Sequence, residues 1–434
     1  MRSQTEHLYF ALEKIVVVCG FIFFMGAIFP VLRNPGDVNV SLQSSSMLNM
    51  LVQLSVYAAI LIFMLRVPWD ILRAVFKNPA ITGILVYVLI SCAWSGVPFF
   101  TLRRAIVFTA TTAAGLFIGV RFDSRQQLRL VAVALLICVV LSAVFILALP
   151  EYGTDVAPNL GAWRGVFLQK NIFARYIVIA AVTLICFRAE TFREKIAKYG
   201  GLVLAVGLLI GSLSKGSYVV MLVSILLMLL YRVLYFNWKR LIPAATVALT
   251  TVAVGAVFVL SNADAFFKLL GKDASLNGRI PMWAAILAVS AQQRWLGFGF
   301  YGFWSTQSYA VWSQLHSFTP LKSHNGFVDV LVDLGLVGLG LLALNTVVVL
   351  WRAMELVARE KTLESQWPLL MLSLILFYNL FESDLMVVNG FMWVFYVAIT
   401  VSTQRALGAY RAPVPGASSP ALQLASATYD PCPQ

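Results

Sequence analysis

A histidine and several basic residues stand near the ends of apolar runs in the second half of the chain. His324 opens one such run, Lys215 lies in a turn of small residues at 211–217, and Arg279 lies in the connection 261–323. Arginine and lysine bind phosphate-type groups, and histidine, which titrates near neutral pH, removes protons from hydroxyl groups. Together these residue types predict attack by a hydroxyl on a centre whose leaving group carries a phosphate or diphosphate.

Further polar residues flank this set. Three of them end the polar segment 150–171 and are candidates for lining the path of the substrate: Arg164, Lys170 and Asn171. Asn325, Asp329 and Asp333 recur at intervals of four, so they share one face of a helix. Ionisable groups at membrane depth tend to face a cavity, a partner or a site. We therefore expect this stripe to point inward and to support the site or pair with a cation such as Arg175.

Each of these residues also has an alternative interpretation. Lys215 suits a loop lysine whose charge reaches the headgroup layer, and His324 suits a polar anchor at a helix start. The glycine-aromatic stretch 296–304 suits an interfacial belt without a catalytic role. Asp329 and Asp333 could instead form a proton or cation path, as in a transporter, although the chain shows no internal repeat.

The composition indicates which elements must position these residues. Hydrophobic residues make up 60% of the 434 positions and charged residues 12%, and the mean hydropathy is +0.85. Soluble proteins have nearer a quarter of their residues charged, so a soluble globular protein and a disordered chain are both excluded. Runs long enough for membrane helices predict an all-α polytopic integral membrane protein with about 12 transmembrane helices, at 13–32, 47–65, 80–97, 105–120, 130–149, 172–187, 199–213, 217–235, 241–260, 325–350, 367–382 and 387–405.

The basic residues predict how the chain is oriented. The formal net charge is +13, with 32 Lys and Arg in total. With the N-terminus inside, 20 of them fall on the inner face and 6 in short outer connections, the long connection 261–323 being set aside. This bias predicts that both termini are cytoplasmic and that anionic membrane lipids attract the inner face. No separate basic domain exists, so nucleic acid is not an expected partner.

Several common types of site are missing from the sequence. The five cysteines are scattered without a C-x-x-C pair, so neither a disulfide framework nor a metal site is expected. No Walker-type loop, dinucleotide fingerprint, G-x-S-x-G or H-E-x-x-H occurs. The first apolar run lacks a cleavage pattern and is interpreted as the first span. We expect no cofactor, no metal and no cytoplasmic nucleotide as the energy source.

At these residues the chain resembles the superfamily of bacterial O-antigen ligases and O-antigen or exopolysaccharide (Wzy-type) repeat-unit polymerases. The resemblance extends over 163–338, while residues 1–150 match only as hydrophobic spans. The Lys-Asn pair and the chain length lean toward the exopolysaccharide-polymerase branch. The motifs occur in the family's order: Trp163-Arg164-Gly165 with Lys170-Asn171, Ser212 to Lys215, Gly278-Arg279 with Trp283, and Ser323-His324-Asn325-Gly326 followed by Leu334-Gly335-Leu336-Val337-Gly338.

The resemblance implies a metal-independent, inverting glycosyltransferase of the bacterial cell inner membrane, with its active site facing the periplasm. The implied donor is a glycan on undecaprenyl diphosphate. The implied acceptor is another repeat unit or, for a ligase, lipid A-core, and polysaccharide-assembly proteins are implied partners. Lys215 and Arg279 would engage the diphosphate, and His324 would act on the acceptor hydroxyl. Lys215 departs from the family's usual arginine, since lysine keeps the charge but loses the guanidinium fork.

Four regions are expected along the chain. They are N-terminal transmembrane helices at 1–150, a ligase-like core at 151–350, C-terminal transmembrane helices at 351–405 and a disordered cytoplasmic tail at 406–434. The core includes the external loop 261–323, which is expected to carry short helices. A connection of that length is usually functional or disordered, and its mixed composition favours function.

Overall fold

The structure is a computed structural model that describes residues 2–28, 47–156, 159–235, 278–315 and 319–411. Their regular secondary structure is helical apart from an isolated β-bridge between Thr154 and Trp163. The long helices are α1 (Arg2–Phe24), α3 (Met47–Met64), α4 (Pro68–Lys77), α5 (Pro79–Ile90), α6 (Pro98–Arg121), α7 (Ser124–Ala148), α9 (Lys170–Cys186), α10 (Phe192–Gly211), α11 (Lys215–Tyr231), α14 (Arg279–Ser290), α17 (Gly326–Glu360), α18 (Leu363–Tyr378) and α19 (Phe391–Arg411). The short ones are α8 (Pro150–Gly153), α15 (Phe303–Thr306), α16 (Ser308–Trp312) and the 3₁₀ turns Ser91–Ala93, Arg232–Tyr235 and Ala291–Gln293.

The predicted all-α class is confirmed for these residues, and several helices suit a membrane. Within the described residues, 4 helices are long and apolar enough to cross a bilayer: Glu6–Phe24 of α1, α6, α7 and α17. The count is up to 5 if α3 and α4, which meet at a bend of 96°, form one broken span. The number of 12 spans stays a prediction, and the predicted run 241–260 lies outside the described residues.

The other predicted runs all overlap helices, but the helix ends differ from the predicted ones. α17 continues to Glu360, beyond the boundary drawn at 350, and α19 continues to Arg411, beyond 405. Hydrophobicity does not mark these ends, because charged residues such as Arg352, Glu355 and Arg405 interrupt the apolar runs before the helices end. The described part of the connection 261–323 contains α14, α15 and α16, and the assignment of this connection as an external loop stays a prediction.

α9 forms the centre of the helical core. Nearly every side chain from Phe173 to Leu184 is buried, on all sides of the helix. A helix that is apolar all round must be surrounded by other helices, and α9 packs against α7, α10, α11 and α18. Its first turn therefore has a fixed place among the ends of these neighbours.

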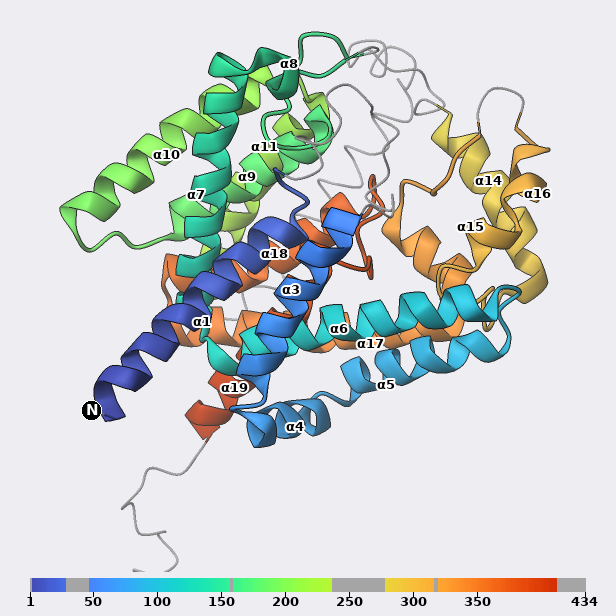
Figure 1. Cartoon of the computed structure of the whole chain (residues 1–434), viewed down its shortest axis with the longest axis horizontal. Helices are drawn as coiled ribbons and strands as arrows, with labels where there is room; N and C mark the ends of the chain where they lie inside the picture. The colour runs from blue at the N-terminus through green and yellow to red at the C-terminus, as the bar shows by residue number, and fades with distance from the viewer. Residues whose placement is uncertain (1, 29–46, 157–158, 236–277, 316–318, 412–434) are drawn as a thin grey trace, which may run out of the picture.

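Two glycines let α6 and α19 approach closely. A Cβ atom added at Gly115 would lie 2.6 Å from the carbonyl oxygen of Val394, and one at Gly119 would lie 2.7 Å from that of Ala398. Small residues four apart are a common device for bringing membrane helices together. The contact fixes α19 against α6 along much of their length (Figure 1).

α17 is broken at Gly335, whose φ of 65° and ψ of −169° are not helical. The segment 294–298 fills the break, and the Leu336 N–H donates to the carbonyl oxygen of Arg294 at 2.9 Å. Irregular backbone at membrane depth requires partners of this kind. A Cβ atom at Gly335 would overlap the carbonyl oxygen of Trp295. The break therefore docks the glycine-aromatic stretch onto α17.

We expect Gly335→Ala to destabilise the protein by about 2–4 kcal/mol, because alanine is strained at this backbone conformation and overlaps Trp295. The matched control is Gly340→Ala in the same helix, where an added Cβ atom meets nothing within 4 Å. Alanine favours a helix over glycine, so the control should melt at the wild-type temperature or above. Thermal unfolding of the detergent-solubilised protein measures both, and equal melting temperatures would contradict the role of the break.

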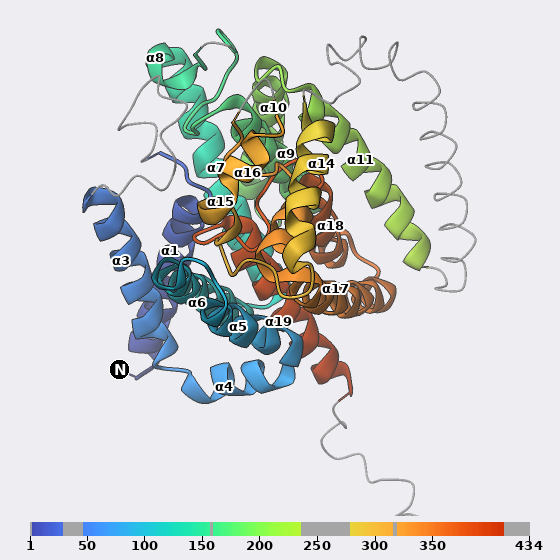
Figure 2. The same cartoon turned by 90° about the vertical axis from the view of Figure 1, so that its right-hand side faces the viewer.

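The molecule has two distinct ends. Figure 1 shows α14, α15 and α16 together at one end, away from the N-terminus, α4 and the last turns of α19, and Figure 2 shows these short helices facing the viewer. α6 runs between the two ends. At a rise of about 1.5 Å per residue its 24 residues extend about 36 Å, comparable to the thickness of a bilayer. The orientation of these ends in a membrane stays a prediction.

Candidate functional site

Glu382 lies between two residues of the predicted site. It belongs to the connection between α18 and α19. Its Oε2 atom is 3.9 Å from Nδ1 of His324, and its Oε1 atom is 4.0 Å from Nη2 of Arg279. Nη1 of Arg279 also donates a hydrogen bond to the carbonyl oxygen of Phe381 at 2.6 Å. Arg279, His324 and Glu382, here called the Glu382 cluster, therefore bring three distant parts of the chain to one place.

The backbone around His324 explains its placement. His324 has a φ of 54°, in the left-handed region that non-glycine residues rarely adopt. Asn325 caps α17, its Oδ1 accepting hydrogen bonds from the N–H groups of Phe327 and Val328. The Gly326 N–H donates to the carbonyl oxygens of Asn379 and Glu382. A strained backbone conformation persists where several surrounding contacts hold it in place. The hydrogen bonds of Asn325 and Gly326 hold the imidazole of His324 against the α18–α19 connection.

The exposure of His324 leaves one side of its ring accessible. Nδ1, which faces Glu382, is buried and forms no hydrogen bond with the described residues. The side chain as a whole is 37% exposed, so the exposure belongs to its other atoms. The separation of 3.9 Å exceeds a hydrogen bond, but catalytic contacts often shorten only when substrate binds. The ring can therefore face Glu382 on one edge and a hydroxyl on the other.

The charge of Glu382 is stabilised by its neighbours. Burial alone would raise the pKa of this carboxyl, but the His324 side chain and the charges of Arg175 and Lys322 lower the pKa to about 2. The ionised form therefore stabilises the fold above the ordinary pKa of 4.5, and this contribution is lost as the pH falls toward 2. At neutral pH Glu382 is a fixed negative charge beside His324 and Arg279.

A second ion pair lies two residues further along the same connection. The guanidinium of Arg175, on α9, contacts the carboxylate of Asp384. Arg175 is only 4% exposed, and its Cζ atom lies 5.6 Å from the ring centroid of Tyr176 and 5.9 Å from that of Tyr378. A buried cation requires such a partner. The pair fixes the α18–α19 connection to the first half of α9.

Lys215 lies at the same end of the molecule. It is the first residue of α11, its side chain is exposed, and the preceding Ser214 donates a hydrogen bond to Oδ1 of Asn171 at 3.2 Å. Asn171 and Arg175 are four residues apart on α9 and share a face. The Lys215 turn therefore contacts α9 one helical turn before Arg175, which contacts Asp384 next to the Glu382 cluster.

The carboxylates Asp329 and Asp333 organise the chain next to His324. Asp333 accepts hydrogen bonds from the backbone N–H groups of Tyr301 and Phe303, at 2.9 and 3.2 Å. Asp329 accepts from the indole N–H of Trp304 and from the backbone N–H of Ser323, both at 3.2 Å. Neither contacts Arg175, whose partner is Asp384. The stripe joins the glycine-aromatic stretch and the His324 turn to α17.

Arg164 and Lys170 hold together the polar segment 150–171, which was predicted to line the path of the substrate. Arg164 is 1% exposed, and its guanidinium donates to the carbonyl oxygens of Tyr152, Leu168 and Glu151 at 3.0, 3.3 and 3.4 Å. Lys170 begins α9, and its backbone N–H donates to a carboxylate oxygen of Asp155 at 3.2 Å. These contacts give Arg164 a structural task, and a role of either residue toward substrate stays a prediction.

Glu382, Asp384 and the contact of Arg175 with Asp384 were not predicted from the sequence. The available signal was the Phe381-Glu382-Ser383-Asp384 stretch, where one carboxylate ends the predicted run 367–382 and a second follows it, whereas α18 already ends at Tyr378. That connection falls on the same predicted face as Arg279 and His324. Its role became visible only when α9, α14 and α17 were placed around it, because these elements are far apart in the sequence.

Comparison with known proteins is consistent with the motifs. Residues 200–343 match the family described as O-antigen ligase. The chain is 24% identical over 271 residues to the exopolysaccharide production protein ExoQ of Rhizobium meliloti (strain 1021). That alignment covers 60% of this chain and 61% of ExoQ, so it spans less than two thirds of the relative's length. The resemblance to the O-antigen ligase and polymerase superfamily, leaning to the exopolysaccharide branch, is confirmed. Lys215, Arg279 and His324 lie inside the matched residues, whereas Glu382 lies beyond them.

Proposed function

From this resemblance we propose that the protein is a membrane glycosyltransferase that moves a glycan from undecaprenyl diphosphate to a sugar hydroxyl at the periplasmic face. Its main activity would be to polymerise exopolysaccharide or O-antigen repeat units. One observation carries the proposal: the Glu382 cluster holds a histidine and an arginine side by side at one end of an apolar helical bundle. A hydroxyl acceptor and an anionic leaving group require this combination.

The proposed reaction is a single displacement. The acceptor oxygen attacks the anomeric carbon of the donor, and a new glycosidic bond forms. The bond between that carbon and the diphosphate oxygen breaks, and undecaprenyl diphosphate leaves with the electron pair. His324 takes the proton of the acceptor hydroxyl. Attack opposite the leaving group inverts the anomeric centre.

The cations act on the leaving group. Negative charge grows on the diphosphate as the bond breaks, and fixed cations stabilise charge that develops in the transition state. Arg279 is anchored to the carbonyl oxygen of Phe381 and keeps further N–H groups for a phosphate oxygen. Lys215 would supply a second positive charge from the start of α11. No nucleotide is needed, because the carrier-linked donor is already activated.

Glu382 would act through His324 rather than on the substrate. We expect Glu382→Gln to lower the transfer rate by about 10–100-fold, as for other groups that orient a reacting histidine. The loss should appear in the rate at saturating donor rather than in donor binding, because Glu382 does not contact the substrate. Glu364→Gln is the control, since Glu364 pairs with Arg125 at 3.4 Å, away from this cluster. An equal rate in Glu382→Gln and Glu364→Gln would contradict the role of the contact.

The acceptor distinguishes a polymerase from a ligase. If the protein is a polymerase, deletion of its gene should abolish long chains and leave single repeat units on the carrier. A ligase deletion would instead leave carrier-linked polymer beside uncapped lipid A-core. The purified protein supplied with carrier-linked repeat units and lipid A-core should, on our proposal, extend the repeat units. Transfer to lipid A-core alone would make the protein a ligase.

A further inference from the structure

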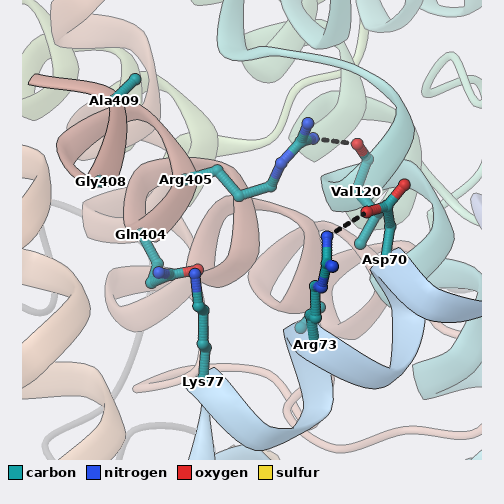
Figure 3. A pocket seen from close by; sticks show the side chains of 9 residues that line it. Asp70, Arg73, Lys77, Val120, Gln404, Arg405, Gly408 and Ala409 are labelled. Carbon is teal, nitrogen blue, oxygen red and sulfur yellow. Dashed lines mark hydrogen bonds and ion pairs between the residues drawn. The ribbon is translucent and has the colours of Figure 1, made fainter. Parts of the chain in front are cut away.

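A basic cavity lies at the opposite end of the molecule from the Glu382 cluster. It has a volume of about 310 Å³ and is lined by residues of α4, the end of α6 and the last turns of α19 (Figure 3). Its charged lining residues are Arg73, Lys77 and Arg405, with Asp70 as the acidic one. Three cations and one carboxylate leave an excess of positive charge. The glycosyl transfer proposed above makes no use of this cavity.

The cations of the cavity differ in how firmly they are held. Arg405 donates to the carbonyl oxygens of Val120 and Gly119, at the end of α6, which fixes its guanidinium at the inner wall. Arg73 and Asp70 are 3.7 Å apart and largely exposed, with 75% and 58% of their side chains accessible. Surface pairs of this kind are weak, so Arg73 can turn to another anion. Figure 3 shows Lys77 on the same helix, with its side chain pointing toward Gln404 of α19.

α4 has the character of a helix that lies on a membrane surface. It meets α3 at a bend of 96°. Trp69, Leu72 and Phe76 are exposed, at 72%, 44% and 76%, and their spacing places them on one face. Asp70, Arg73 and Lys77 occupy the adjoining face at the same spacing. Helices with an apolar face and a basic face lie at the boundary of headgroups and acyl chains.

We propose that this cavity binds the headgroup of an anionic phospholipid of the phosphatidylglycerol class. The lining carries a net charge of +2 from three cations and one carboxylate, which favours an anionic phosphodiester over a zwitterionic headgroup. The exposed apolar face of α4 would lie against the acyl chains of the same lipid, which a free phosphate cannot offer. Basic pockets between helices at the cytoplasmic side are a recurring form of lipid recognition, and Arg73, Lys77 and Arg405 fall on the predicted cytoplasmic side.

The test is a titration of the purified full-length protein in neutral detergent with a short-chain phosphatidylglycerol, followed by thermal unfolding. Wild type should be stabilised by phosphatidylglycerol and much less by phosphatidylcholine of the same chain length. Arg73→Gln with Lys77→Gln should weaken the apparent affinity by roughly 25-fold, since each basic residue near an anionic lipid contributes about a factor of 5. Asp70→Asn should strengthen it, because the competing carboxylate is removed.

The matched control is Arg193→Gln with Lys195→Gln, the same change of charge at exposed residues of α10 that do not line the cavity. It should keep the wild-type affinity. Equal stabilisation by both lipids, or equal weakening in both double variants, would overturn the proposal. Inorganic phosphate is the third ligand to be titrated in the same experiment. If it stabilises the protein as strongly as the lipid, the cavity is a free-anion site and the proposed lipid occupant is wrong.

Discussion

Replacement of His324 by alanine is expected to lower the rate of glycan transfer by about 10²–10⁴-fold, the range that a general base contributes. The imidazole carries the nitrogen base of the Glu382 cluster, and its side chain retains exposed atoms that a hydroxyl can reach. The protein should remain folded, because Nδ1 forms no hydrogen bond with the described residues. The measurement is the initial rate of transfer from carrier-linked glycan, with thermal unfolding as the folding check.

His7→Ala is the matched control for this variant. His7 is exposed on α1, at the other end of the molecule, and its replacement should leave the rate unchanged. Full activity of His324→Ala in a folded protein would remove the proposed base. Transfer would then have to proceed with a proton acceptor other than this histidine.

Replacement of Arg279 by glutamine is expected to lower the rate by about 10²–10³-fold, the effect of removing one group that stabilises developing negative charge. Arg279→Lys should fall between wild type and glutamine. Lysine keeps the charge but lacks the planar guanidinium, which can donate hydrogen bonds to the carbonyl oxygen of Phe381 and to a phosphate oxygen at the same time. The rate at saturating donor separates this loss from weaker donor binding.

Arg294→Gln is the control, since Arg294 is an exposed arginine of the same connection. Its rate should match wild type. Lys215→Arg gives an independent check, because arginine keeps the positive charge at this turn and adds the guanidinium fork. We expect Lys215→Arg to retain activity. If Arg279→Gln transferred glycan as fast as Arg294→Gln, charge at position 279 would have no part in the reaction.

The sequence was sufficient for the helical class and for the positions of most helices, because both follow from local hydrophobicity. It also placed His324 at the start of α17, where Asn325 is an N-cap of a common type. The motifs around Lys215, Arg279 and His324 could be found one by one, since each is a short local pattern. Counting spans predicts that all three lie on one face of the membrane, and this stays a prediction.

What the sequence could not show depends on contacts between distant segments. Glu382 carries no local motif, and its importance arises from the approach of α14 and α17 to the α18–α19 connection. The burial of Arg164 and the hydrogen bonds of its guanidinium to backbone carbonyl oxygens also depend on such contacts, while its contact with substrate stays a prediction. The stripe of Asp329 and Asp333 was expected to support the site or pair with Arg175. Its partners are mainly backbone N–H groups, which no side-chain pattern reveals.

The most direct test of the account uses the purified protein in liposomes with one substrate, the carrier-linked repeat unit that a deletion strain accumulates. The measurement is the molar ratio of released undecaprenyl diphosphate to newly formed glycosidic bonds. We predict one diphosphate for each new bond with wild type, and neither product at a comparable rate with His324→Ala. Movement of the intact donor across the bilayer without any new bond would contradict the account, because the protein would then be a transporter.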